Sequence, residues 1–274
     1  MKIPVTRPVF GDEEVAAVAE CLASGWVVQG PKVAEFEALW AAFTGAPFAR
    51  ATTSCTTALH LALLGVGVGP GDEVLVPAFT WIATANAVEY CGATPVFVDI
   101  DERTFNIDPS AIEASITPRT KAVVPVHEFG LSADMDAVMA VAAAHGLRVV
   151  EDAACATGSR YRGRHVGTFG DVGCFSFHPR KAITTGEGGM LTTADEHLAT
   201  LFEVLRSHGA EESDLARHAG ASGFALPEFK RLGFNYRMTD IQAAIGVVQM
   251  GRLEGILEAR RALANLAEHR RDHG

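Results

Sequence analysis

The chain has 274 residues, 48% of them hydrophobic, and a formal net charge of −10. This length and apolar content suffice for one large or two ordinary globular domains with a substantial buried core. The negative charge and the lack of a basic run argue against a nucleic-acid-binding or anionic-membrane surface.

The predicted elements alternate between helices and strands from about residue 31 to residue 193. Short β-branched apolar runs separated by helical patterns are typical of an α/β fold with a mainly parallel sheet flanked by helices. Several runs are apolar throughout, as expected for strands covered on both faces. The predicted strands are 73–76, 96–98, 122–126, 148–151, 174–177 and 190–193. The predicted helices between and after them are 56–64, 80–90, 109–116, 134–145 and 196–208.

The pattern changes after residue 208. Residues 209–223 are polar and rich in Gly, Ala and Ser, which predicts a long loop of the kind that often carries function. A last long helix is predicted from about Thr239 to Ala267, with a Thr/Asp cap at its start and a charged tail after it.

Cysteine usage and the N-terminal sequence bear on the cellular compartment. The five cysteines are odd in number and form no C-x-x-C pair, so neither a disulfide framework nor a zinc site is predicted. His127, His165 and His178 lack the paired spacing of metal ligands. The N-terminus has no apolar targeting segment, and no apolar run is long enough to span a bilayer. We expect a cytoplasmic protein with no metal and no membrane partner.

One lysine lies between an apolar strand and a glycine-rich turn. Lys181 follows Ser176-Phe177-His178-Pro179-Arg180 and precedes Thr184-Thr185-Gly186-Glu187-Gly188-Gly189. A primary amine in such a turn can form a Schiff base with an aldehyde, and pyridoxal phosphate is the common aldehyde cofactor. An isolated lysine in a turn is more often a solvated surface residue. The cofactor hypothesis therefore requires a phosphate cradle, a partner for the pyridine nitrogen and a group that stacks on the ring.

Candidates for all three groups occur in the chain. Small hydroxyl residues in 52–57 precede an apolar helix, where free N–H groups and the helix dipole favour an anion, although an ordinary N-cap has the same appearance. Asp152 ends an apolar strand and could pair with a pyridine nitrogen, with Glu151 pointing the opposite way; a helix cap is the alternative. Trp81 follows another strand end and could stack on the ring or belong to the core.

Six segments in a fixed order extend this pattern over nearly the whole chain. They are 67–74 (GVGPGDEV), 93–99 (ATPVFVD), 124–127 (VPVH), 151–154 (EDAA), 176–189, which contains Lys181, and 233–240 (GFNYRMTD). Together they closely resemble the DegT/DnrJ/StrS-type sugar aminotransferases, which are pyridoxal-phosphate (PLP) enzymes of fold type I.

The resemblance implies a role for each matched residue. Lys181 would hold the cofactor as an internal aldimine and then move the proton, Asp152 would pair with the pyridine nitrogen, and Trp81 would stack. Cys55, Thr56 and Ser176 would cradle the phosphate. Cys155 would lie near the phenolic oxygen of the cofactor, and Asn235 would reach in from a neighbouring subunit, which implies a homodimer with shared active sites.

The resemblance also implies a reaction and a division of the chain. An amino group would pass from L-glutamate to a nucleotide-linked keto-sugar in a ping-pong mechanism. Residues 1–30 would form an N-terminal segment, 31–238 the large PLP-binding α/β domain, and 239–274 a connecting helix and the start of a truncated small domain. That truncation leaves open a non-catalytic PLP-binding remnant or interaction subunit. The dehydratase branch of the family replaces the cofactor lysine, so Lys181 argues against it.

Overall fold

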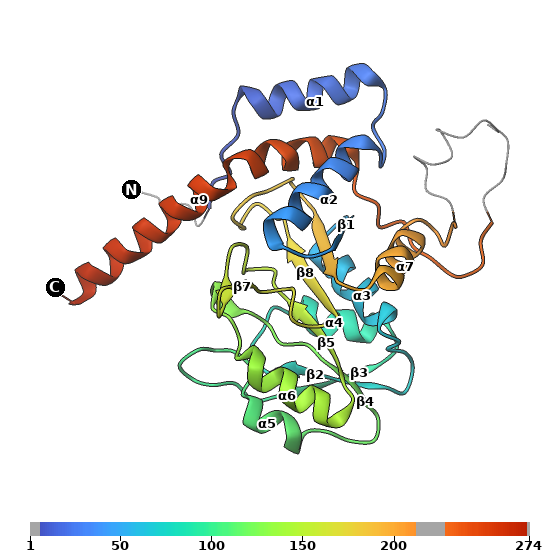
Figure 1. The fold of residues 1–274 in the computed structure, drawn as a ribbon, viewed down its shortest axis with the longest axis vertical. Helices are drawn as coiled ribbons and strands as arrows, with labels where there is room; N and C mark the ends of the chain where they lie inside the picture. The colour runs from blue at the N-terminus through green and yellow to red at the C-terminus, as the bar shows by residue number, and fades with distance from the viewer. Residues whose placement is uncertain (1–5, 212–227, 273–274) are drawn as a thin grey trace.

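The structure is a computed structural model that describes residues 6–211 and 228–272. Most of the predicted 209–223 loop, residues 212–223, lies outside the described residues. The described helices and strands form three layers, with a central sheet between two layers of helices (Figure 1). The predicted α/β class is therefore confirmed.

The central sheet has seven strands in the order β1-β9-β8-β5-β4-β2-β3. All neighbours from β8 to β3 pair in parallel, whereas β9 is antiparallel to both β8 and β1. The sheet is thus mainly parallel, as predicted. The bounds of its strands are β1 Phe48–Thr52, β2 Glu73–Pro77, β3 Thr94–Val98, β4 Thr120–Val123, β5 Arg148–Asp152, β8 Val172–Ser176 and β9 Gly189–Thr193. A two-stranded hairpin, β6 Arg160–Tyr161 and β7 Arg164–His165, lies apart from it.

Alternate side chains of the strands pack against helices on opposite faces. On β5, Val150 packs with α3 and α7, whereas its neighbour Val149 packs with α6. The first face carries α3 (Cys55–Gly65), α4 (Ala83–Tyr90) and α7 (Glu196–Arg206). The second carries α5 (Pro109–Ala114) and α6 (Met135–His145) over one half of the sheet and α2 (Pro31–Thr44) and α9 (Asp240–Asp272) over the other. The sheet is therefore buried on both sides, which explains its continuous apolar runs.

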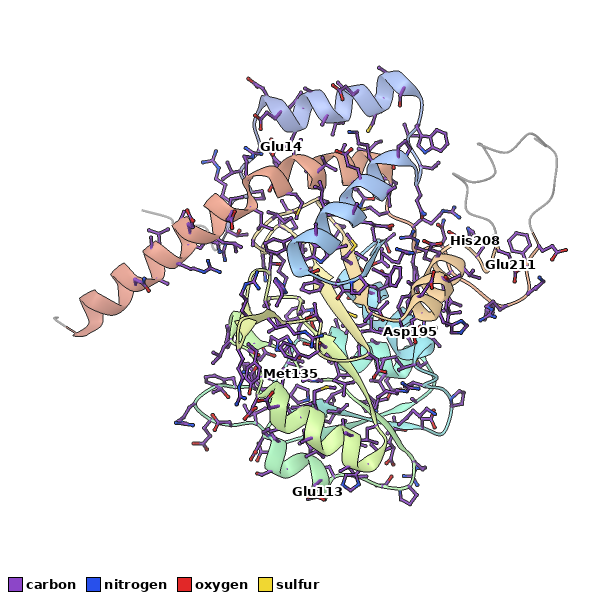
Figure 2. The ribbon with its side chains drawn as sticks, in the orientation of Figure 1. Glu14, Glu113, Met135, Asp195, His208 and Glu211 are labelled. Atoms are coloured by element: carbon purple, nitrogen blue, oxygen red, sulfur yellow. The ribbon has the colours of Figure 1, made fainter. Side chains whose placement is uncertain are left out.

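Polar side chains fix the outer helices. Glu14 lies on α1 (Asp12–Ser24), where that helix meets α9 (Figure 2). It accepts a hydrogen bond of 2.6 Å from Gln249 of α9 and pairs with Arg252. Asp240, at the start of α9, accepts hydrogen bonds from the N–H groups of Gly30, Lys32 and Val33 at the start of α2. The second half of α9 still contacts the molecule, where Arg261 donates to Gly158 O at 3.1 Å, and the helix then projects outward at its C-terminal end (Figure 1). Among the described residues, no helix combines the length and apolarity needed to cross a bilayer.

The predicted elements differ from the structure mainly at their ends. The 122–126 strand ends at Val123, because Pro125 has no N–H group for the ladder; Val126 then makes only an isolated bridge to Asp152. The 80–90 helix begins at Ala83, which leaves Thr80 and Trp81 in the preceding turn. The sequence patterns did not indicate β1 or the β6–β7 hairpin.

Candidate functional site

A cavity of about 1610 Å³ opens where the carboxyl ends of the parallel strands meet. The segments that follow β2, β4, β5 and β8 all contribute to its wall, as does the start of α3. Ligands of open α/β sheets bind at this edge. The volume exceeds that of an ordinary small-molecule pocket, so it has room for a cofactor together with a large substrate.

Lys181 lines this cavity from the loop after β8. The two ends of the loop are joined, because Phe177 N donates to Gly188 O at 2.9 Å, and within the loop Lys181 N donates to His178 O at 2.8 Å. The amine Nζ donates to Sγ of Cys155 at 3.0 Å. A thiol is a weak acceptor, so the amine is not committed to an acidic partner and remains available to an aldehyde.

Asp152 and Glu151 point to opposite sides of β5. Asp152 lines the cavity, and its carboxylate accepts hydrogen bonds from Thr84 Oγ1 at 2.8 Å and from Ala154 N at 3.1 Å. Glu151 is fully buried on the other side, next to His127 and the 167–170 turn. The predicted opposition of the two acids is confirmed, and only Asp152 faces a space that could hold a ligand.

The start of α3 supplies an anion site. Ser54 caps the helix by accepting from Thr57 N at 3.2 Å, so the N–H groups of Cys55 and Thr56 lie in the first turn, where helices leave such groups unpaired. Gly189 of β9 lies so close that a Cβ there would collide with Ser54 O and Cys55 N. Burial raises the pKa of the Cys55 thiol well above its usual range, so this side chain stays neutral beside an anion.

The other predicted residues occupy different positions around the cavity. Ser176 is buried at the end of β8 and lines the cavity beside the α3 start. Trp81 lines the cavity and is 75% exposed, so its indole is free to cover a ring. Cys155 lies on the wall next to Lys181. Asn235 is exposed and is not among the residues that line this cavity, so it would have to act at another site.

Several cavity residues were not predicted from the sequence. Glu128 is 8% exposed and lines the wall; because burial and then the charge of Asp152 disfavour ionisation, its pKa is raised to about 7. Thr84, which is buried and does not itself line the cavity, donates a hydrogen bond to Asp152 from the first turn of α4. Their positions just beyond strand ends were the available signal. The residues that line the cavity also include five arginines, Arg160, Arg162, Arg180, Arg260 and Arg261.

The three histidines that were considered as metal ligands each bond to a different partner. His127 bonds to Glu151, His165 Nε2 accepts from Gly158 N, and His178 Nδ1 accepts from Arg180 N. Among the residues that the structure describes, no group of three or more His, Cys, Asp or Glu side chains is arranged to hold a metal ion.

The donor set of the cavity fits pyridoxal phosphate. A lysine amine, a carboxylate, a helix N-terminus and an exposed indole line the same space. They match in turn the aldehyde, the ring nitrogen, the phosphate and the flat ring of the cofactor.

Comparison with known proteins agrees with this fit. A sequence model of the DegT/DnrJ/EryC1/StrS aminotransferase family matches residues 8–270. The chain is 50% identical over 262 residues to the spore coat polysaccharide biosynthesis protein SpsC of Bacillus subtilis, covering 96% of this chain and 67% of SpsC. It is 47% identical over 270 residues to the GDP-perosamine synthase of Caulobacter vibrioides, covering 98% of this chain and 70% of the synthase.

The fold also resembles that of a solved aminotransferase structure. The fold superimposes with a TM-score of 0.82 on DesV of S. venezuelae, determined in complex with a ketimine intermediate, at 41% identity. That alignment covers 89% of this chain and 62% of DesV, so the chain spans about two thirds of the length of these relatives.

Proposed function

Because the chain belongs to the DegT/DnrJ/EryC1/StrS aminotransferase family, we propose that it transfers an amino group from L-glutamate to a nucleotide-linked keto-sugar. Enzymes of this family depend on PLP. The observation that carries the proposal is the presence of Lys181 and Asp152 in one cavity with the N-terminus of α3. The relative named GDP-perosamine synthase supports a nucleotide-linked sugar as the acceptor.

The residues of this chain divide the chemistry between them. Bound PLP supplies an electron sink that stabilises negative charge on the carbon next to the amino group. Lys181 Nζ would hold the cofactor covalently and remove the proton from Cα of the amino donor. Asp152 would keep the ring nitrogen protonated, and the N–H groups of Cys55 and Thr56 would bind the phosphate.

The size and charge of the cavity support a large anionic acceptor. Five arginines line the wall in addition to Lys181, and guanidinium groups bind phosphate oxygens with two donors at once. A nucleotide-linked sugar carries a diphosphate, so these side chains would bind it outside the cofactor site. One cavity would serve both donor and acceptor in turn, which is the arrangement that a ping-pong mechanism requires.

The site would be completed by a second copy of the chain. Asn235 is exposed and outside the cavity of its own chain, so we assign it to the cavity of a partner subunit in a homodimer. Mixing Lys181→Ala with Asn235→Ala chains tests this. Only one of two sites in each mixed dimer would be intact, and random exchange should restore about a quarter of the wild-type rate. No restoration, from chains shown to exchange subunits, would contradict a shared site.

We also place the protein in a reducing compartment, the cytoplasm. All five cysteines are free, and four of them are buried. The prediction can be checked by fractionating the native cells and probing for the chain.

The experiment that tests the proposed function follows both halves of the reaction. The purified chain is loaded with PLP, and its absorption spectrum is recorded before and after L-glutamate, with L-lysine as a control donor. We expect a spectral change and stoichiometric 2-oxoglutarate with glutamate only. Addition of GDP-, UDP- and dTDP-linked keto-sugars in turn should restore the first spectrum with one of them. A chain that binds PLP but does not respond to any donor would support the binding-only alternative.

A further inference from the structure

The amine of Lys181 lies against the thiol of Cys155 on the wall of the cavity. Nζ and Sγ are 3.0 Å apart, and both residues line the same space. They come from different segments, because Cys155 follows β5 and Lys181 follows β8. A nitrogen with a lone pair to share thus lies in contact with a sulfur atom, at the separation from which two groups can react.

Cys155 differs from the other cysteines in its exposure. It is exposed on the cavity wall, whereas Cys21, Cys55, Cys91 and Cys174 are buried. A small oxidant such as hydrogen peroxide can therefore reach the Cys155 sulfur, and accessible thiols are the ones that peroxide oxidises. We expect Cys155 to be the first of the five cysteines to react.

The backbone holds the two side chains in place. On the cysteine side, Ala153 and Ala156 are fully buried, and Ala156 N donates to Ala153 O at 2.9 Å, which closes a turn around Cys155. On the lysine side, Lys181 N donates to His178 O at 2.8 Å. Because neither side chain has to be brought from a distance, an oxidised Cys155 would meet the amine at a high effective concentration.

A second thiol on the cavity wall is a weaker competitor for an oxidised Cys155. Cys55 also lines the cavity, but it is 8% exposed. Burial, followed by the charge of Asp152, raises the pKa of the Cys55 thiol well above its usual range. A thiol attacks only as the thiolate, so Cys55 is a poor partner. The amine of Lys181 already contacts the Cys155 sulfur and is the group that we expect to capture it.

We propose that Cys155 and Lys181 form an oxidative switch, in which peroxide leads to a sulfur–nitrogen bond between their side chains. In the first step, the Cys155 thiolate attacks one oxygen of hydrogen peroxide, the O–O bond breaks, and a sulfenic acid and hydroxide form. In the second step, the lone pair of Lys181 Nζ attacks the sulfur and the S–O bond breaks. The hydroxyl group leaves as water with a proton from the amine. The sulfur loses two electrons and the peroxide gains two.

The bond would remove the amine that the proposed mechanism needs. The nitrogen of the resulting sulfenamide keeps only one hydrogen, so it could not attach PLP. A thiol reverses the bond: it attacks the sulfur, the S–N bond breaks, and the amine leaves with a proton. A second thiol then reduces the mixed disulfide and restores Cys155. The effect on activity rests on the proposed function, whereas the bond depends only on the contact between the two side chains.

The first test follows the bond directly, in the chain without added cofactor. The chain is treated with hydrogen peroxide, digested without reductant and analysed by mass spectrometry. We expect one linked peptide pair, containing Cys155 and Lys181, that is about 2 Da lighter than the two reduced peptides together, because two hydrogens are lost. Dithiothreitol should separate the pair. Cys155→Ser and Lys181→Arg should form no link, whereas Cys91→Ala, which changes a buried cysteine, should form it as the wild type does.

A trap for sulfenic acids distinguishes a paired cysteine from one that is merely exposed. Dimedone marks a sulfenic acid permanently. In the wild type the amine should consume the sulfenic acid first, so we expect about tenfold more dimedone on Cys155 in Lys181→Arg than in the wild type. Lys181→Ala should behave like Lys181→Arg, so one misfolded variant does not decide the result. Equal labelling of wild type and variants, or a disulfide between Cys155 and Cys55, would overturn the proposal.

The PLP-loaded chain separates this inference from the proposed function. Attachment of PLP to Lys181 should protect the pair, so we expect about tenfold less of the link than in the cofactor-free chain after the same peroxide treatment. A link that forms equally with and without bound PLP would contradict the attachment of PLP to Lys181 and leave the switch standing. A cofactor-free chain that forms no link, although its Lys181 binds PLP, would overturn the switch alone.

Discussion

The two sides of β5 carry adjacent carboxylates that differ in their hydrogen bonds and in their access to the cavity. On the closed side, Glu151 accepts four hydrogen bonds, from the N–H groups of Gly167, Phe169 and Gly170 at 2.6–2.7 Å and from His127 Nε2 at 3.0 Å. On the open side, Asp152 accepts two and faces the cavity. The first carboxylate has no capacity left for a ligand.

This difference in hydrogen bonding indicates that Glu151 stabilises the fold, whereas Asp152 is available for chemistry. Burial raises the pKa of Glu151, but the hydrogen bonds from His127 and from the 167–170 backbone outweigh it, so the pKa is lowered overall. His127 accepts from Ala133 N through Nδ1, which leaves Nε2 to donate to Glu151. The closed side thus fastens a turn to the sheet, whereas the open side keeps polar groups partly unpaired where a ligand can reach them.

The largest expected effect is on the open side, at Lys181. Lys181→Ala removes the amine that would hold the cofactor and move the proton, so we expect transamination to fall by about 10⁴-fold, with a folded chain. Rates and circular dichroism are measured together. Lys121→Ala, which changes an exposed lysine at the other end of the sheet, is the control and should leave the rate unchanged. Appreciable turnover by Lys181→Ala would remove the basis of the site assignment.

On the closed side, Glu151→Gln should destabilise the fold. The amide of glutamine would face backbone N–H donors, so we expect a loss of about 3–5 kcal/mol in the free energy of unfolding, measured by urea titration. Since the folded pKa of Glu151 lies below its ordinary 4.5, the advantage of the wild type is present above that value and should be lost as the pH falls through the folded pKa. A variant with normal stability would show that the closed side is not structural.

The matched substitution on the open side, Asp152→Asn, should lower the rate of transamination and leave the stability almost unchanged. Asparagine can still accept one hydrogen bond and donate another, so stability should change by less than about 1 kcal/mol. The ring nitrogen would lose its anionic partner, and we expect the rate to fall by about 10²–10³-fold. Urea titration and steady-state kinetics measure the two quantities. A large loss of stability without a loss of rate would reverse our assignment of the two acids.

Glu128→Gln should change how stability depends on pH. The folded pKa of Glu128, about 7, is above its ordinary 4.5, so its contribution is complete below about 4.5 and is lost as the pH rises to about 7. The wild type should therefore lose about 2 kcal/mol relative to Glu128→Gln across that window, allowing for screening by water in the cavity. Parallel stability curves for the two proteins would contradict the raised pKa.

Trp81→Ala should have the smallest effect. An exposed indole that covers the cofactor ring contributes about 1 kcal/mol, so PLP should bind roughly fivefold more weakly, with Trp81→Phe close to the wild type. Equilibrium titration with PLP measures the change. Equal affinity of all three proteins would show that Trp81 does not stack.

The sequence predicted the parts of the site that depend on strand ends. Lys181 and Trp81 each follow a strand and Asp152 ends one, and the two-residue period of β5 was enough to separate Asp152 from Glu151. Strand β1 was missed because it is short and contains Arg50, and it is held mainly by pairing with β9, more than a hundred residues away. The strand propensity of a short stretch of sequence does not reveal such a long-range pairing.

The hydrogen bonds from Thr80 through Thr84 to Asp152 could not be predicted from the sequence for a related reason. Thr84 and Asp152 are 68 positions apart, and their side chains meet because β2, which precedes α4, and β5 both pair with β4 in the sheet. The 80–90 segment was predicted to be helical throughout, whereas Thr80 lies in the turn before α4. Which polar groups meet in the cavity is thus decided by strand order rather than by local pattern.

The most direct test of the account is to find where the cofactor attaches. The chain is incubated with PLP, reduced with borohydride, digested and analysed by mass spectrometry. We predict one modified residue, Lys181, and no modification in Lys181→Ala. Modification of a different lysine, or none in a folded chain, would contradict the assignment of the open side of β5 as the active site.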